Sequence, residues 1–291
     1  MSTTSHVTAL TSKENRRFTS FPGSSYVLPS DEMEYTRLTI QHLMWRRAFE
    51  GRLLYAPVTL KDGDEVLETG TGTGVWLLDL AKEYPGSVNL HGTDIEPNLF
   101  PKSHPENIHF SLASVTALSR DWDNKFNLVN QRFLVAALKK SEWPIALEEL
   151  RRVLAPGGWL QLFEPAAREA GSTMARMQAI TACLYELQGL TGYILTRQLP
   201  DMLKNLGFVN IRIEERSLPL GNWAGQEGLD GRKMMMLIYA AMKPAVLKSG
   251  GFGLVNSEEE YDHLLEILAK EMDSTPGTYI KACAIYAQKP E

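Results

Sequence analysis

The feature that most constrains this chain is a run of alternating glycines at residues 68–74, Glu-Thr-Gly-Thr-Gly-Thr-Gly. An apolar pair, Val66 and Leu67, precedes the run, and a helical pattern with apolar residues on one face follows it. The order strand, glycine turn, helix is typical of α/β folds in which the backbone passes close beneath a bound ligand. The segment therefore predicts an α/β domain with a ligand at this turn.

An acidic residue supports that ligand. The next predicted strand, 88–93, ends at Asp94, which follows Gly74 by 20 residues. A carboxylate at this place in such folds binds both hydroxyls of a ribose. A glycine-rich turn without any ligand is the alternative, but the position of Asp94 favours an adenosine-containing cofactor.

The charge next to the turn distinguishes between such cofactors. A dinucleotide places its pyrophosphate at the helix N-terminus, where Glu68 would repel it. S-adenosylmethionine brings a sulfonium and an ammonium group to the same region. The spacing G-x-G-x-G also departs from the dinucleotide pattern, and no G-K-[ST] follows to indicate a P-loop. The sequence therefore predicts S-adenosylmethionine as the cofactor.

Strand and helix patterns alternate along the rest of the chain, which is typical of a parallel, doubly wound sheet. The predicted fold class is α/β: a Rossmann-like, seven-stranded, mostly parallel sheet with helices on both faces, an N-terminal helical cap and a helical insertion before the last strand. Beyond 88–93, strands are expected at 108–112, 126–130, 159–163, 209–214 and 281–287.

Three segments are expected. Residues 1–20 are rich in Ser and Thr and predict a disordered tail. Residues 21–60 form the N-terminal helical cap, and residues 61–291 form the main domain, with the insertion at about 222–275. Within the insertion, Ser257 and Glu260 have the spacing of a helix capping box.

Composition excludes several classes of partner. The net charge is -5 and no long basic run occurs, which argues against nucleic acid. Two cysteines, Cys183 and Cys283, are too few for a disulfide scaffold, and no residue set has metal-ligand spacing. Neither a signal peptide nor a membrane span is visible, so a cytoplasmic protein is expected, with a nuclear location possible. The oligomeric state is not indicated.

A family resemblance adds to this reading. Residues 61–165 resemble class I methyltransferases, with 68–74 as the first motif, Asp94 as the ribose acid and Leu-Ala-Pro-Gly-Gly at 154–158 before the fifth strand. The first half of the chain is similar to the fungal LaeA-like group, on the segments 26–31, 93–95, 130–134 and 143–144 together with Glu34, Arg37, Leu38, Gln41 and His42. The resemblance implies methyl transfer to a small molecule, in particular a secondary metabolite.

The expected cofactor-binding residues follow from the motifs and the resemblance. They are Glu68, Gly70, Thr71, Gly72, Gly74, Asp94, Ile95, Ser114, Val115, Asn130 and Gln131. Ser114 stands where the family often has an Asp that contacts the adenine, so the contact would come from its hydroxyl or from the backbone. Asn130 and Gln131 end the fourth strand at the ligand-binding edge, and a simple strand-end turn is the alternative.

Two residues are candidates for a general base, which is needed only if the acceptor arrives protonated. His42 lies on the predicted cap helix, where a packing role is the alternative. Glu164 ends the fifth strand, where capping the next turn is the alternative. Arg37 and Arg132 could bind the carboxylate of the cofactor or form ion pairs, and the methionines at 234–236 could line a pocket or pack in the core.

Two other functions remain open at this stage. An enzyme of the same fold can use the sulfonium only as a positive charge in a rearrangement that transfers no methyl group. A regulatory protein of a nuclear complex is the other alternative, suggested by the LaeA-like resemblance. Fold alone does not separate these functions.

Overall fold

The computed structural model describes residue 21, residues 28–169 and residues 171–291, so the tail expected at 1–20 lies outside the described residues. The strands are β1 (Glu65–Thr69), β2 (Asn89–Asp94), β3 (Ile108–Leu112), β4 (Phe126–Arg132), β5 (Leu154–Glu169), β6 (Val209–Pro219) and β7 (Tyr279–Gln288). The helices are α2 (Glu32–Ala48), α3 (Val75–Glu83), α4 (Glu142–Val153), α5 (Ser172–Leu187), α6 (Leu195–Asn205), α7 (Gly225–Lys248) and α8 (Glu258–Ser274).

The strands form one seven-stranded sheet in the order β3-β2-β1-β4-β5-β7-β6. Neighbours from β3 to β5 are parallel, while β7 is antiparallel to both β5 and β6. The chain moves outward from β1 to β3 and then returns to place β4 on the other side of β1. Ligands of such sheets bind at the carboxyl ends of the strands beside this switch. The predicted fold class is confirmed.

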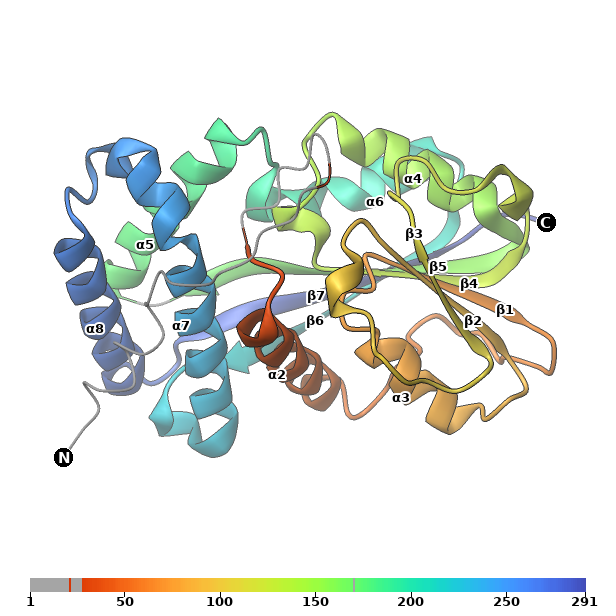
Figure 1. Cartoon of the computed structure of the whole chain (residues 1–291), viewed down its shortest axis with the longest axis horizontal. Helices are drawn as coiled ribbons and strands as arrows, with labels where there is room; N and C mark the ends of the chain where they lie inside the picture. The colour runs from red at the N-terminus through yellow and green to blue at the C-terminus, as the bar shows by residue number, and fades with distance from the viewer. Residues whose placement is uncertain (1–20, 22–27, 170) are drawn as a thin grey trace.

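Helices cover both faces of the sheet (Figure 1). On one face, α4 and α6 bury Trp143, Leu150 and Leu199 in a shared apolar cluster. On the other face, α3 contributes Trp76 and Leu77 to a second cluster. A third cluster joins α2, α5, α7 and α8 beside the antiparallel part of the sheet. The insertion expected at about 222–275, before the last strand, corresponds to α7 and α8.

Helix α2 buries a polar face. Asp31 caps its N-terminus by accepting a hydrogen bond from the backbone N–H of Glu34 at 3.1 Å. The buried side chains are Glu34, Arg37, Gln41, His42, Met44 and Trp45. Most of them are polar and need hydrogen-bond partners. The position of α2 therefore determines which polar side chains line the space beneath it.

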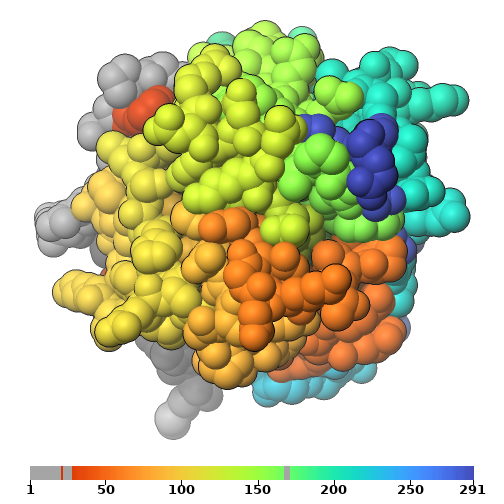
Figure 2. Space-filling model, turned by 90° about the vertical axis from the view of Figure 1, so that its right-hand side faces the viewer, coloured from red at the N-terminus to blue at the C-terminus, as the bar shows by residue number. Residues whose placement is uncertain are grey.

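At the amino ends of the parallel strands, opposite the ligand side, the surface of the sheet is formed by turns and by the C-terminal residues. Figure 2 looks onto this end, with the residues that lead into β1 in orange and the last residues of the chain in blue. The backbone N–H of Gly157 donates to the carbonyl of Lys289 at 3.0 Å, and the N–H of Lys289 donates to Gly158 at 2.9 Å. These hydrogen bonds fasten the end of the chain to the turn before the long part of β5.

Candidate functional site

A cavity of about 490 Å³ lies at the carboxyl ends of β1, β2, β3 and β4. The turn after β1 and the segments after the other three strands form its floor, and α2 with Phe21 and Ser30 forms the opposite wall. The lining residues used below are Arg37, Leu38, His42, Gly70, Thr71, Gly72, Asp94, Ile95, Ser114, Val115, Arg132, Phe133 and Leu134.

The turn at 70–74 needs its glycines for two reasons. Gly70, Gly72 and Gly74 all have positive φ, at 61°, 52° and 66°, a conformation that side chains disfavour. A Cβ atom on Gly70 would also lie 2.8 Å from the side chain of Leu134, and one on Gly74 would lie 2.6 Å from Phe110. The turn therefore exposes bare backbone to the cavity at Gly70 and Gly72, while Gly74 lies behind it at the start of α3.

Asp94 lies beside that turn. One carboxylate oxygen accepts a hydrogen bond from the N–H of Gly72 at 2.7 Å, and the other accepts from the N–H of Glu96 at 3.0 Å. Burial raises the pKa of Asp94, while these backbone donors lower it. Because each oxygen of a carboxylate accepts more than one hydrogen bond, the group retains acceptors for a diol in the cavity. This geometry fits the ribose role.

Ile95, Ser114 and Val115 line the same side of the cavity, after β2 and β3. The hydroxyl of Ser114 lies 2.8 Å from that of Thr116, within hydrogen-bond distance. The apolar side chains of Ile95 and Val115 line the cavity together with this polar pair. Their contact with an adenine ring stays a prediction.

Glu68 lies behind the turn and does not line the cavity. Its carboxylate accepts hydrogen bonds from Thr71 at 2.7 Å, from Asn130 at 3.2 Å and from Arg132 at 3.0 Å. Burial raises the pKa of Glu68, and the Arg132 guanidinium opposes that rise. In the structure the carboxylate forms an ion pair with Arg132, and its contact with the cofactor stays a prediction.

Asn130 and Gln131 are also placed differently from expectation. Both are fully buried, because β4 continues to Arg132 instead of ending at 130. Asn130 accepts a hydrogen bond from Gln161 at 3.0 Å, and Gln131 accepts one from Thr69 at 3.1 Å. The residues that turn into the cavity are the next ones, Arg132 to Leu134.

Glu164 is enclosed beneath the cavity. Its two carboxylate oxygens accept hydrogen bonds from the N–H groups of Leu134 at 2.8 Å and Val135 at 3.1 Å. Burial raises its pKa to about 8 despite these donors. This is the geometry of a carboxyl group that caps a turn, which was the alternative to a catalytic role, and it fixes the segment after β4 that lines the cavity.

His42 lines the cavity from α2, but both of its ring nitrogens have partners. Nδ1 lies 3.0 Å from a terminal nitrogen of Arg132, and Nε2 lies 3.0 Å from the carboxylate of Asp79. Burial and the Arg132 guanidinium lower the pKa of His42 to about 4. The ring is therefore neutral at pH 7, with Nε2–H donating to Asp79 and Nδ1 accepting from Arg132. A role as general base stays a prediction.

Of the remaining candidates, Arg37 lines the cavity and the methionines at 234–236 do not. Arg37 lines the cavity, and its guanidinium forms a pair of hydrogen bonds with Glu34, at 2.8 and 2.7 Å. The methionines at 234–236 are buried in the core around α7, which was the alternative to a pocket. Leu38, Phe133 and Leu134 line the cavity but were not expected there, since apolar side chains in the sequence do not distinguish core from ligand wall.

Comparison with known proteins identifies the family. Residues 66–158 match the family described as a methyltransferase domain. The N-methyltransferase tcpN of Claviceps purpurea is 31% identical to this chain over 83% of the chain and 89% of its own length. The chain belongs to the class I S-adenosylmethionine-dependent methyltransferases. This methyltransferase is also 28% identical to the N-methyltransferase verN of Clonostachys rogersoniana, over 92% of the chain and 93% of verN.

Two further comparisons concern the LaeA-like group and the fold. It is 27% identical to the protein-methionine methyltransferase laeA of Emericella nidulans, over 74% of the chain and 58% of laeA, which confirms the LaeA-like resemblance. Phosphoethanolamine N-methyltransferase 2 of Haemonchus contortus, solved with S-adenosylhomocysteine, superposes with a TM-score of 0.51 at 16% identity. That superposition covers 90% of this chain and 60% of the nematode enzyme and shows the shared fold.

The predicted activity and cofactor are thereby confirmed. The enzyme uses S-adenosylmethionine to methylate a small-molecule acceptor. Among the residues that the structure describes, no group of His, Cys, Asp and Glu side chains is arranged to hold a metal ion. Within the same residues, no helix combines the length and the apolar character needed to cross a membrane.

Proposed function

We propose that this methyltransferase transfers the methyl group to a nitrogen atom of a small molecule bound in the cavity beneath α2. The observation that carries the proposal is that one cavity is bordered by the bare backbone of Gly70 and Gly72, by the carboxylate of Asp94 and by the cap helix. The N-methyltransferases tcpN and verN, to which the chain is similar along most of its length, support nitrogen as the acceptor atom.

The order of the strands supports one direction for the cofactor. Asp94 at the end of β2 would bind the ribose hydroxyls, and Gly70, Thr71 and Gly72 would lie beneath the centre of the molecule. Ile95, Ser114 and Val115 are on the β3 side, where the adenine would fit. Because β1 lies between β2 and β4, the methionine part would extend the other way, toward Arg132.

The cofactor, when bound, supplies a methyl carbon already activated by the positive sulfur. The chain must then align a nucleophile with that carbon and exclude water, which can lower the barrier by on the order of 7 to 11 kcal/mol. A neutral amine held in the cavity would offer its own lone pair to that carbon, and the methylated nitrogen would afterwards release its proton to solvent. Such an acceptor needs no general base, which agrees with a neutral His42 whose two nitrogens are occupied.

The walls of the cavity indicate the character of the acceptor. Leu38 and Ser30 face it from the cap, and Phe133, Leu134 and Leu138 face it from the segment after β4. An acceptor with a large apolar surface and few charges would fit these walls. The expected cytoplasmic or nuclear location stays a prediction.

The test is a comparison of metabolite extracts incubated with the enzyme and isotopically labelled S-adenosylmethionine. We expect a labelled product that carries the added methyl group on nitrogen. The matched control is Asp94→Asn, which keeps the size of the side chain and removes the carboxylate. Label on oxygen or carbon would contradict the nitrogen acceptor, and label found only on protein would contradict a small-molecule substrate.

A further inference from the structure

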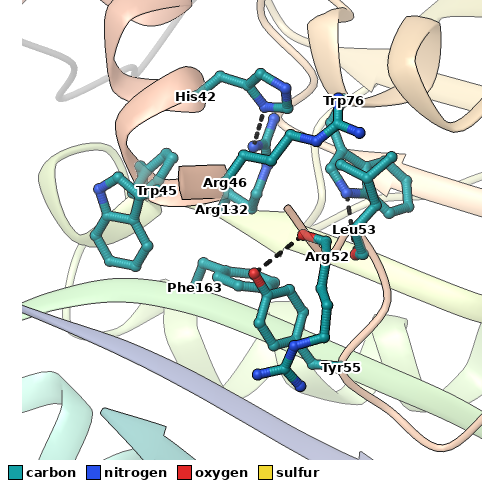
Figure 3. Close-up of a pocket in the computed structure, with 10 residues that line it drawn as sticks. His42, Trp45, Arg46, Arg52, Leu53, Tyr55, Trp76, Arg132 and Phe163 are labelled. Carbon is teal, nitrogen blue, oxygen red and sulfur yellow. Dashed lines mark hydrogen bonds between the residues drawn. The ribbon is translucent and has the colours of Figure 1, made fainter. Parts of the chain in front are cut away.

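Arg132 is held from several sides at the point where β4 meets the cavity. Its Nε donates to the Glu68 carboxylate at 3.0 Å, and one terminal nitrogen lies 3.0 Å from the same oxygen. The other terminal nitrogen donates to Nδ1 of His42, and His42 in turn donates to Asp79. Figure 3 shows His42 of α2 meeting the guanidinium of Arg132. Residues from β1, β4, α2 and α3 therefore fix one guanidinium group.

Arg132 lines two spaces. One is the large cavity, and the other is a small space of about 20 Å³ lined by aromatic rings, among them Trp45, Tyr55 and Phe163 (Figure 3). Only 11% of the Arg132 side chain is exposed. A cation so deeply buried is costly unless it is paired, and Glu68 pairs it. The pairing keeps the charge in place before any ligand arrives.

We propose that Arg132 binds the carboxylate of the methionine part of the cofactor, and that His42 and Asp79 are positioning residues that act through Arg132. The proposal rests on the proposed function, because it takes the cofactor to lie in the large cavity.

Three observations carry this assignment. With the ribose at Asp94, the methionine part would extend toward β4, and Arg132 is the last residue of β4. Each terminal nitrogen of an arginine carries more than one N–H bond, and within the described residues each has one partner here. Arg37, which also lines the cavity, lies on the cap helix with its partners Glu34 and Gln41 and not at the end of β4. The N–H groups that remain on Arg132 have the planar geometry that carboxylates bind.

The roles of His42 and Asp79 follow from the direction of their hydrogen bonds. Nδ1 of His42 accepts from Arg132 only while its proton is on Nε2, and Asp79 selects that form by accepting from Nε2–H. Hydrogen bonds from Lys82 and His42 outweigh burial and lower the pKa of Asp79 to about 2, so Asp79 stays ionised. His42 is thus a neutral link between an ionised carboxylate and the guanidinium.

The test compares two ligands by isothermal titration calorimetry. S-adenosylhomocysteine carries the amino-acid part, whereas 5′-methylthioadenosine keeps the adenine, ribose and sulfur but lacks the carboxylate. We expect Arg132→Lys to weaken S-adenosylhomocysteine about 10- to 100-fold, since a lysine does not make paired hydrogen bonds. The affinity for 5′-methylthioadenosine should change by less than about twofold.

Positioning is tested at Asp79 and His42, where the Glu68–Arg132 pair stays intact and the fold is not at risk from an unpaired charge. Asp79→Asn and His42→Ala should each weaken S-adenosylhomocysteine about threefold to tenfold without changing 5′-methylthioadenosine. His42→Asn, which keeps an acceptor for Arg132, should restore most of the loss. Arg46→Gln is the matched control, because Arg46 contacts the same Asp79 from the solvent side.

The outcomes separate the two proposals. A parallel loss of affinity for both ligands in the Arg132 and Asp79 variants would mean a purely structural role and overturn the inference. An unchanged affinity for S-adenosylhomocysteine in folded Arg132→Lys would overturn it as well. If the wild-type enzyme binds neither ligand, the proposed function fails, and the inference fails with it.

Discussion

Two buried cations of this enzyme are held by carboxylates in different ways. Arg132 at the cavity is paired with Glu68, whose side chain is 1% exposed. Lys243 in α7 is 2% exposed and contacts Asp262 and Glu258 of α8, whose side chains are 35% and 37% exposed. Water therefore solvates the acids of the second cluster but not the acid of the first. The difference shows that burial of both partners, and not the ion pair itself, distinguishes the Arg132–Glu68 pair beside the cavity from a contact that joins two helices.

The largest expected effect tests the pair of Arg132 with the buried Glu68. Glu68→Ala leaves the Arg132 guanidinium buried without its counter-charge, so the free energy of unfolding should fall by about 3 to 5 kcal/mol. Chemical denaturation followed by circular dichroism measures this change. A loss below about 1 kcal/mol would mean that Arg132 reaches solvent easily, and the contrast with Lys243 would disappear.

The pH dependence of stability sharpens the same contrast. His42 has a pKa near 6.5 when unfolded and about 4 in the folded enzyme, where Arg132, Arg46 and Asp79 surround it. As the pH falls from 7 to 4, protons bind the unfolded chain first, so this residue should remove about 3 kcal/mol of stability over that range.

The measurement is the free energy of unfolding at several pH values for the wild type and for His42→Asn. Because other groups titrate over the same range, the difference between the two proteins isolates His42. The variant should lose less stability on acidification. Parallel curves would show that folding does not lower the pKa of His42, which contradicts a buried imidazole that faces the Arg132 guanidinium.

The smallest effect is expected at the second cluster. Lys243→Met removes the cation and keeps the length and apolar stem of the side chain, while Asp262 and Glu258 remain solvated. The free energy of unfolding should fall by about 1 to 2 kcal/mol, less than for a fully enclosed pair. Calorimetry with S-adenosylhomocysteine should give the wild-type affinity, and a weakened affinity would show that the α7–α8 contact also shapes the cavity.

How far the sequence predicted the site depends on whether a feature is local. The glycine turn and Asp94 could be predicted because the strand, the turn and the next strand fix their positions within 30 residues. The ion pair between Glu68 and Arg132 could not be predicted. The two residues are 64 positions apart in the sequence, and only the pairing of β1 with β4 brings them together. Asn130 and Gln131 were misplaced because β4 runs two residues further than its apolar pattern.

The fold shows the same division. Alternating apolar segments predicted every strand of the sheet, but β5 and β6 extend beyond those segments because β7 pairs with them along their length. At α8, Ser257 accepts from the N–H of Glu260 at 3.1 Å, as the capping pattern indicated. The carboxylate of Glu260 does not complete the capping box but contacts Asn256 and Arg176. The contact with Arg176 depends on the packing of α5 against α8, which the spacing of residues in the sequence does not reveal.

The position of β7 in the sheet has a consequence for the synthesis of the protein. Tyr279–Gln288 leaves the ribosome after β5 and β6, yet it lies between them in the sheet. Among the described residues β6 has β7 as its sheet neighbour, so β6 must wait unpaired while about 60 further residues are translated, several seconds at typical rates. A nascent chain stalled before residue 279 would therefore present an unpaired strand edge, the kind of surface that recruits chaperones or aggregates.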